Sequence, residues 1–211
     1  MTRVNDVVDK VYVRNLTRRP DRIEQIVPEL ARVGIKWERF TADDHLDRNE
    51  SPRYTNAMNL KSMLYITRAN RWKSVLLLDD DTYFCKDFEQ KFDEFWQQVP
   101  DDWDSVSLSS IFRNDIADQE FVAPLVIRSY ESWGGHATIV NAKAYVAYIN
   151  TIKGDRWVDV ELAELYPHIN HYVAYPALAG QREGYSDLQQ SYRLNDYYGV
   201  DKHEDDRKAG E

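Results

Sequence analysis

Three consecutive carboxylates, Asp79, Asp80 and Asp81, are the residues of this chain whose type and spacing best suit chemistry. They directly follow a short apolar run, residues 75–78, which predicts a strand buried on both faces of a sheet. Adjacent carboxylates repel one another, so each favours its protonated form unless a cation lies nearby. Mg2+ or Mn2+ would offset this charge, because both prefer hard oxygen ligands. The alternative is a solvated acidic turn.

Alternation along an extended segment predicts which side each of the three carboxylates faces. Residues i and i+2 of a strand point to the same side. Asp79 and Asp81 are therefore expected to hold one metal ion together, or to divide between the metal ion and a ribose, while Asp80 faces the other way.

Three families place carboxylates in such a setting. Haloacid-dehalogenase-like phosphatases use Asp-x-Asp-x-Thr after their first strand, with the first Asp as nucleophile; that role would fall to Asp79, but Thr82 comes one position too early. Receiver domains distribute their acids over two strand ends and need a distant lysine, so they fit less well. The run Leu78-Asp79-Asp80-Asp81-Thr82 most resembles GT-A glycosyltransferases, which place hydrophobic-Asp-x-Asp-Thr at the end of a central strand.

The elements that must position these residues follow from hydrophobic periodicity. Strands and helices alternate, which predicts one α/β domain over residues 1–200 with a largely parallel, twisted sheet, followed by a charged, frayed tail, 201–211. Gly34 should end the first long helix, and Pro28 inside it predicts a kink or a late start. The predicted strands are 10–15, 35–40, 75–78, 105–109, 136–140 and 171–175, and the predicted helices are 20–33, 54–69, 88–96, 141–152 and 155–166.

Composition excludes several classes of protein. The chain has 211 residues with 27 Lys and Arg against 36 Asp and Glu, a net charge of −9, which argues against broad nucleic-acid binding. Aromatic and aliphatic residues are too plentiful for global disorder, and no apolar run approaches the roughly 20 residues of a membrane span. A single cysteine, Cys85, forms no internal disulfide, and no apolar stretch opens the chain. A cytoplasmic location is therefore expected.

Several segments resemble glycosyltransferase family 25. Residues 11–22 contain Asn15-Leu16-Thr17-Arg18-Arg19-Pro20-Asp21-Arg22, similar to the family's opening Asn-Leu-x-Arg-Arg-Pro-Asp-Arg. Residues 134–137 and 173–181 are similar to its later motifs, and Ser186-Asp187 to its closing Ser-Asp element. The acidic motif reads Asp-Asp-Asp rather than Glu-Asp-Asp. The family's Ser-His pair before it is replaced by Asn59-Leu60-Lys61. The resemblance covers nearly the whole chain in order.

The resemblance implies a GT-A fold and transfer of a hexose from a nucleotide sugar, most simply a UDP sugar, to a hydroxyl of a glycan or glycoprotein. Mn2+ or Mg2+ is the implied cofactor, and further domains of a longer protein are possible partners. Asp159 would be the base and Lys61 a second catalytic residue. The implied donor-binding residues are Val13, Asn15, Arg18, Arg22, Asp79, Asp80, Trp133, Gly134 and Gly135, and the implied metal ligands are Asp79, Asp81 and His136, with His168 and His171 as alternatives to His136.

Two other functions stay open on the sequence. A phosphatase would use Asp79 as nucleophile on phosphate monoesters and need no nucleotide. A noncatalytic sugar-binding module would bind glycans regardless of chelators.

Overall fold

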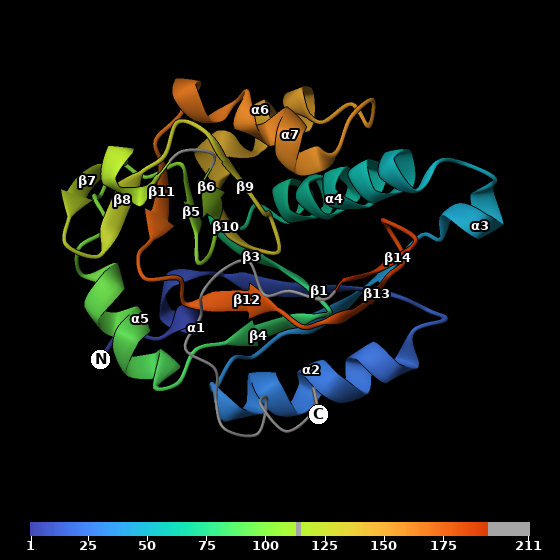
Figure 1. The fold of residues 1–211 in the computed structure, drawn as a ribbon, viewed down its shortest axis with the longest axis horizontal. Helices are drawn as coiled ribbons and strands as arrows, with labels where there is room; N and C mark the ends of the chain where they lie inside the picture. Colours follow the sequence, from blue (N-terminus) through green and yellow to red (C-terminus); the bar gives the residue numbers. More distant parts are fainter. Residues whose placement is uncertain (113–114, 194–211) are drawn as a thin grey trace.

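The computed structural model describes residues 1–112 and 115–193, and its main sheet has eight strands in the order β2-β1-β3-β10-β5-β11-β8-β7 (Figure 1). β10 and β8 run antiparallel to their neighbours, while the other strands share one direction. The bounds are β1 Lys10–Leu16, β2 Glu38–Ala42, β3 Ser74–Asp79, β5 Ser105–Ser107, β7 Glu120–Ala123, β8 Val126–Arg128, β10 Ala137–Asn141 and β11 His171–Ala174.

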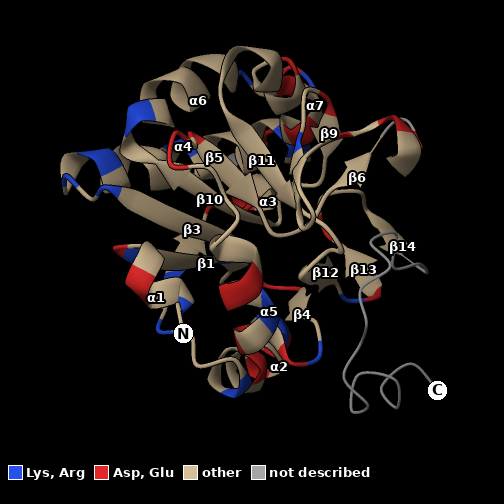
Figure 2. Cartoon of the chain, turned by 90° about the vertical axis from the view of Figure 1, so that its left-hand side faces the viewer, with Lys and Arg blue, Asp and Glu red and all other residues tan. Residues whose placement is uncertain are grey.

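Helices cover both faces of the sheet. α2 (Pro20–Arg32) and α5 (Phe88–Trp96) pack on one face, with α1 (Val4–Val7) beside them, and α4 (Pro52–Ala69), α6 (Tyr145–Thr151) and α7 (Val158–Ala163) pack on the other (Figure 1). α3 (His45–Arg48) joins β2 to α4, and three short 3-10 turns are Ile116–Asp118, Ala142–Ala144 and Tyr166–His168. Figure 2 shows charged residues on the outer helices and loops, while the central strands are mostly of other types.

Alternation along β3 creates the two cores. Leu76 and Leu78 belong to the cluster under α2 and α5, whereas Val75 and Leu77 belong to the cluster under α4, α6 and α7. Because both faces are covered, β3 is apolar from Val75 to Leu78, directly before its final aspartate, as expected for a central strand. This confirms the buried strand predicted before the acidic triplet.

Three short pairings lie outside the main sheet. β4 (Thr82–Phe84) pairs with β12 (Ala179–Gln181), β6 (Ile111–Phe112) with β9 (Ser132–Trp133), and β13 (Gly184–Ser186) with β14 (Ser191–Arg193). Each of these strands has only two or three residues, so periodicity along the chain does not reveal them.

The first long helix corrects two expectations. α2 begins at Pro20, not later, and continues past Pro28, which lies on its exposed side. Gly34 does end it: with φ of +64°, it donates to Ala31 O while Ile35 N donates to Leu30 O. This closing turn uses Ile35, so β2 begins at Glu38 rather than at residue 35.

One further expectation is only partly met, and another is untested. The predicted helix over 155–166 is α7, Val158–Ala163, followed by the 3-10 turn Tyr166–His168. The predicted tail, 201–211, lies outside the described residues. Within the described ranges, the longest helices are too short or too polar to cross a bilayer.

Candidate functional site

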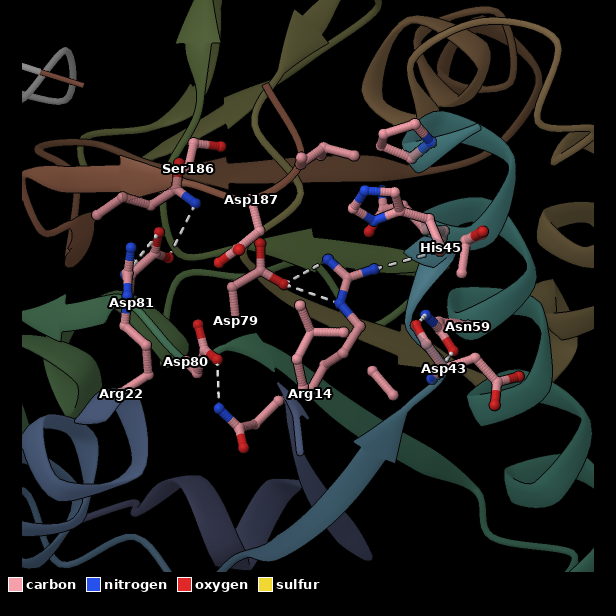
Figure 3. Close-up of a pocket in the computed structure, with 18 residues that line it drawn as sticks. Arg14, Arg22, Asp43, His45, Asn59, Asp79, Asp80, Asp81, Ser186 and Asp187 are labelled. Atoms are coloured by element: carbon pink, nitrogen blue, oxygen red, sulfur yellow. Dashed lines mark hydrogen bonds and ion pairs between the residues drawn. The ribbon is translucent and has the colours of Figure 1, made fainter. Parts of the chain in front are cut away.

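The acidic triplet lies where β3 ends and the chain turns into β4. Asp79 is the last residue of β3, and Asp80 and Asp81 form the turn. The turn interrupts strand alternation, so all three carboxylates line one cavity (Figure 3). The expectation that Asp80 faces away is therefore wrong.

Asp79 is paired with Arg14 of the neighbouring strand. The parallel register of β1 and β3 places Arg14 opposite Asp79. Both Nε and Nη2 of Arg14 donate to Asp79 Oδ1, at 3.2 and 2.5 Å, and Nη1 donates to the carbonyl of Asn56 on α4 at 3.4 Å. Sequence reasoning missed Arg14, because strand register cannot be read from the residues of either strand alone.

Asp81 is held by residues from three separate segments. Arg22 Nη1 lies 3.2 Å from Asp81 Oδ2, an ion pair whose angle falls outside hydrogen-bond geometry. Gln181 Nε2 donates to Asp81 Oδ1 at 3.1 Å, and Arg182 N donates to the Asp81 carbonyl at 2.7 Å. The pairing of β12 with β4 brings residues 181 and 182 to this turn.

Asp80 is buried and has a raised pKa. Asn15 at the end of β1 donates through Nδ2 to Asp80 Oδ2 at 2.6 Å. Burial first, and then repulsion from Asp81 and Asp79, raises the pKa of Asp80 to about 7, against the lowering effects of Asn15 and Arg22. The negative charge of the triplet is thus only partly offset by the chain itself.

The first cavity, of about 140 Å3, is acidic. Among the described residues, its lining includes five carboxylates, from Asp43, Asp79, Asp80, Asp81 and Asp187, and two guanidinium groups, from Arg14 and Arg22. Asn59 on α4 fixes the end of β2 here: its Oδ1 accepts from Asp43 N at 2.8 Å and its Nδ2 donates to Asp43 O at 2.9 Å. A polyanionic ligand would meet repulsion in this cavity unless a cation accompanied it.

A second cavity, of about 710 Å3, adjoins the first and differs from it in character. Its lining includes Trp133 at the end of β9 with Gly134 and Gly135 directly after it, and Trp157 and Asp159 at the start of α7. The two cavities share the lining residues Arg14, Asn56, Asp79, Gln181 and Leu188. Asp79 therefore stands at the boundary between an acidic and a largely apolar space.

The late hairpin β13–β14 borders both cavities. Ser186 and Asp187 line the first, Gln189 and Tyr192 line the second, and the intervening Leu188 lines both. The connection from β1 to α2 holds this hairpin in place. Arg22 Nη2 donates to the carbonyl of Tyr185 at 2.8 Å, and Asp187 accepts from Arg18 and Arg19.

The structure brings some of the sequence-predicted residues together. Asn15, Arg22 and the three aspartates line the first cavity, and Trp133, Gly134, Gly135, His136 and Asp159 line the second. His136 Nε2 is 3.0 Å from Ser109 Oγ, and the ring is buried.

Other predicted residues lie elsewhere. Val13 is fully buried in the core, and Arg18 pairs with Asp44 and Asp187 at the edge of the site. Lys61 donates through Nζ to the carbonyl of Ile152 at 3.0 Å, which gives no support to a catalytic role. Of the two alternative histidines, His171 is buried against Ser105, and His168 borders a third cavity beside α7.

The first cavity contains side chains that could bind a divalent cation. The carboxylate oxygens of Asp79 and Asp81 suit Mg2+ or Mn2+. Over residues 1–112 and 115–193, however, no group of three or more His, Cys, Asp or Glu side chains is gathered to hold a metal ion. A cation here fits the mode in which one or two carboxylates bind it and water or phosphate oxygens supply the rest.

Comparisons with known proteins add two structural likenesses. No protein-family model and no curated protein sequence matches the chain. The solved structure of A197 from STIV is similar with a TM-score of 0.47 at 16% identity, covering 92% of this chain and 99% of that one. A glycosyltransferase involved in the glycosylation of the major capsid of PBCV-1 is similar with a TM-score of 0.48 at 13% identity, covering 86% of this chain and 96% of that one.

Proposed function

We propose that this protein is a glycosyltransferase of GT-A type that moves a hexose from a nucleotide sugar, most simply a UDP sugar, to a hydroxyl of a glycan or glycoprotein. One observation carries the proposal. The acidic turn after β3 meets Asn15, at the end of β1, and Arg22, at the start of α2, in a cavity that shares Asp79 with a larger, more apolar cavity. Such an arrangement offers one space for a charged donor and another for the reacting sugars. It also agrees with the likeness of residues 11–22 to family 25.

The chain's own residues supply binding and orientation of the donor. Arg22 is almost fully buried beside Asp81, and a guanidinium in that position can donate to phosphate oxygens. Asn15 holds Asp80 in place through its amide. Asp79, at the boundary of the two cavities, faces the place where a donor sugar would lie between them.

A divalent cation, Mn2+ or Mg2+, is part of the proposal. Asp81 and Asp79 would hold it, and when bound it would neutralise the diphosphate that leaves as the sugar is transferred. The unbalanced negative charge of the first cavity supports this role.

Asp159 is proposed as the base that accepts the proton of the attacking hydroxyl. Its carboxylate lines the second cavity, which also contains Asp79 in its wall. A base in this position would lie on the acceptor side, away from the charged donor groups.

The test is thermal unfolding with a panel of UDP, GDP and dTDP sugars, each with MnCl2 and with chelator. A donor at 100 times its Kd should stabilise the folded state by about 2.7 kcal/mol, and only when metal is present. Asp81→Asn should abolish this shift and the hydrolysis of the donor sugar. The control is Asp118→Asn, because Asp118 is an exposed carboxylate outside both cavities.

The alternatives give different results. A phosphatase would hydrolyse p-nitrophenyl phosphate without nucleotide and lose this activity in Asp79→Asn. A sugar-binding module would be stabilised by glycans in the presence of chelator. A wild-type protein that no nucleotide sugar stabilises would refute the proposal.

A further inference from the structure

The second cavity has features that the donor does not require. Its volume of about 710 Å3 lies in the range of small-molecule sites, roughly 300–1,000 Å3. α4 contributes Leu60 and Met63 to its lining, and β3 contributes Leu77 and Leu78. Leu60, Met63 and Leu77 all pack in the cluster under α4, α6 and α7, and they give the cavity an apolar floor, in contrast to the acidic cavity on the other side of Asp79.

Two tryptophans from different elements stand at this cavity. Trp133 lies in β9, where it pairs with Ile111 of β6, and it is partly exposed. Trp157 precedes α7 and is 37% exposed, with the guanidinium of Arg53 at 5.4 Å from its ring. β9 also packs against α7, so the two rings belong to one local unit. Indole rings left open to solvent in a cavity offer flat apolar surface to a ligand.

The charges at the cavity restrict which ligand fits. Among the described residues, the ionisable groups of its lining at neutral pH are Arg14, Asp79 and Asp159, apart from the buried ring of His136. Arg14 is already paired with Asp79. The described lining therefore carries two carboxylates against one guanidinium, with Arg53 outside it over the Trp157 ring, and this excess of acidic groups disfavours a ligand that carries a carboxylate, sulfate or phosphate.

We infer that the second cavity is the acceptor subsite and that its ligand is a neutral sugar residue, whose apolar face of C–H groups packs on Trp157 and Trp133. The inference rests on the proposed function, because it names the acceptor of the same reaction. The hydroxyls of a neutral sugar can reach Asp159 at one side of the cavity and the donor position beside Asp79 at the other. Anionic sugars are disfavoured by the excess of carboxylates over guanidinium groups in this lining.

Binding can be measured without any nucleotide. The probes are neutral methyl glycosides of hexoses, 6-deoxyhexoses and pentoses, with methyl glucuronide as the anionic comparison, and the readout is saturation-transfer NMR. At least one neutral glycoside should receive saturation on its ring protons, and methyl glucuronide should receive none. Trp157→Ala should weaken binding about tenfold and Trp157→Phe much less, because Phe retains a flat ring.

A second tryptophan variant and a control variant complete the binding test. Trp133→Ala should also weaken glycoside binding, and it repeats the test on a separate element. Tyr65→Ala removes an aromatic ring that is 51% exposed on α4 outside both cavities, so binding should be unchanged. Unfolding of each variant in urea separates loss of binding from loss of fold.

Kinetics distinguish the acceptor site from the donor site. Hydrolysis of the donor needs only water, so Trp157→Ala should lower the ratio of transfer to a glycoside over donor hydrolysis about tenfold. Glycoside binding that neither tryptophan variant alters, or tighter binding of the glucuronide, would overturn the inference. If nucleotide sugars bind and neutral glycosides do not, the inference fails alone. If glycosides bind through Trp157 and no nucleotide sugar binds, the proposed function fails instead.

Discussion

Glu161 should stabilise the fold through its negative charge, and the effect can be isolated with one substitution. Its buried carboxylate accepts backbone hydrogen bonds from residues 153–156, the segment that leads into Trp157 and α7. Oε2 accepts from Lys153 N at 2.9 Å, and Oε1 accepts from Gly154, Asp155 and Arg156 at 3.0 to 3.1 Å. These donors hold the pKa of Glu161 below its ordinary value despite burial.

Glu161→Gln keeps the shape of the side chain and replaces one oxygen by an NH2 group. The new donor would face the N–H of Lys153, so one charge-assisted hydrogen bond is lost and one backbone donor is left unpaired. Such a bond contributes about 1.5–3 kcal/mol and an unpaired buried donor costs about 1–3 kcal/mol. Because the two contributions overlap, we expect the free energy of unfolding to fall by about 3 kcal/mol near pH 7.

The pH dependence gives the sharper test. A carboxylate whose folded pKa is lowered contributes stability that is complete above its unfolded pKa, near 4.5, and is lost as the pH falls through the folded value. The difference between wild type and Glu161→Gln, measured by urea denaturation, should therefore shrink as the pH falls below 4.5.

A matched substitution on the same segment controls for surface effects. Glu164 is 63% exposed and pairs with Arg156 at 2.7 Å, so Glu164→Gln should cost no more than about 1 kcal/mol. If Glu161→Gln costs as little as Glu164→Gln, or if its cost does not change with pH, the carboxylate does not hold this segment and the reasoning is refuted.

Three further changes should lower the free energy of unfolding in urea. Glu29→Ala removes the buried acceptor of Phe84 N at 2.6 Å and should lower the free energy of unfolding by about 2–4 kcal/mol. The control Glu24→Ala, on the exposed side of the same helix, should lower it by less than about 0.5 kcal/mol. Equal losses would contradict the role of Glu29. Gly180→Ala places a Cβ 2.6 Å from a buried tyrosine ring and should cost about 1–3 kcal/mol, so an unchanged midpoint would show that the ring yields freely. Asn59→Ala removes both side-chain bonds to the end of β2 and should cost about 1–2 kcal/mol, and a smaller loss would mean that water replaces them.

The parts of the site that could be predicted from sequence are those that local pattern determines. The apolar run before Asp79 fixes a central strand, and the carboxylate-rich turn follows it directly. Asn15 and Arg22 lie at the end of the first strand and the start of the first long helix, where α/β sheets bind ligands. In each case, neighbours in the chain are also neighbours in the site.

The parts that were missed depend on contacts between distant segments. Arg14 reaches Asp79 only because of the β1–β3 register, and Gln181 reaches Asp81 only because β12 pairs with β4. Trp157 and Trp133 line the same cavity because α7 packs on β9. The likeness of residues 173–181 and 185–187 to family motifs was the available signal for the late hairpin, although it assigned no role to Gln181 or Asp187.

The order of the segments along the chain has a consequence for synthesis. The last strand of the main sheet, β11, ends at Ala174, while the residues that close both cavities lie between Gln181 and Tyr192. A growing chain thus contains every strand of the sheet before it contains Asp187, Tyr185 and Gln181, which contact Arg18, Arg22 and Asp81 respectively. Ligand binding is consequently a property acquired late in translation, and a product that stops before Gln181 would present the acidic turn with no hairpin to close it.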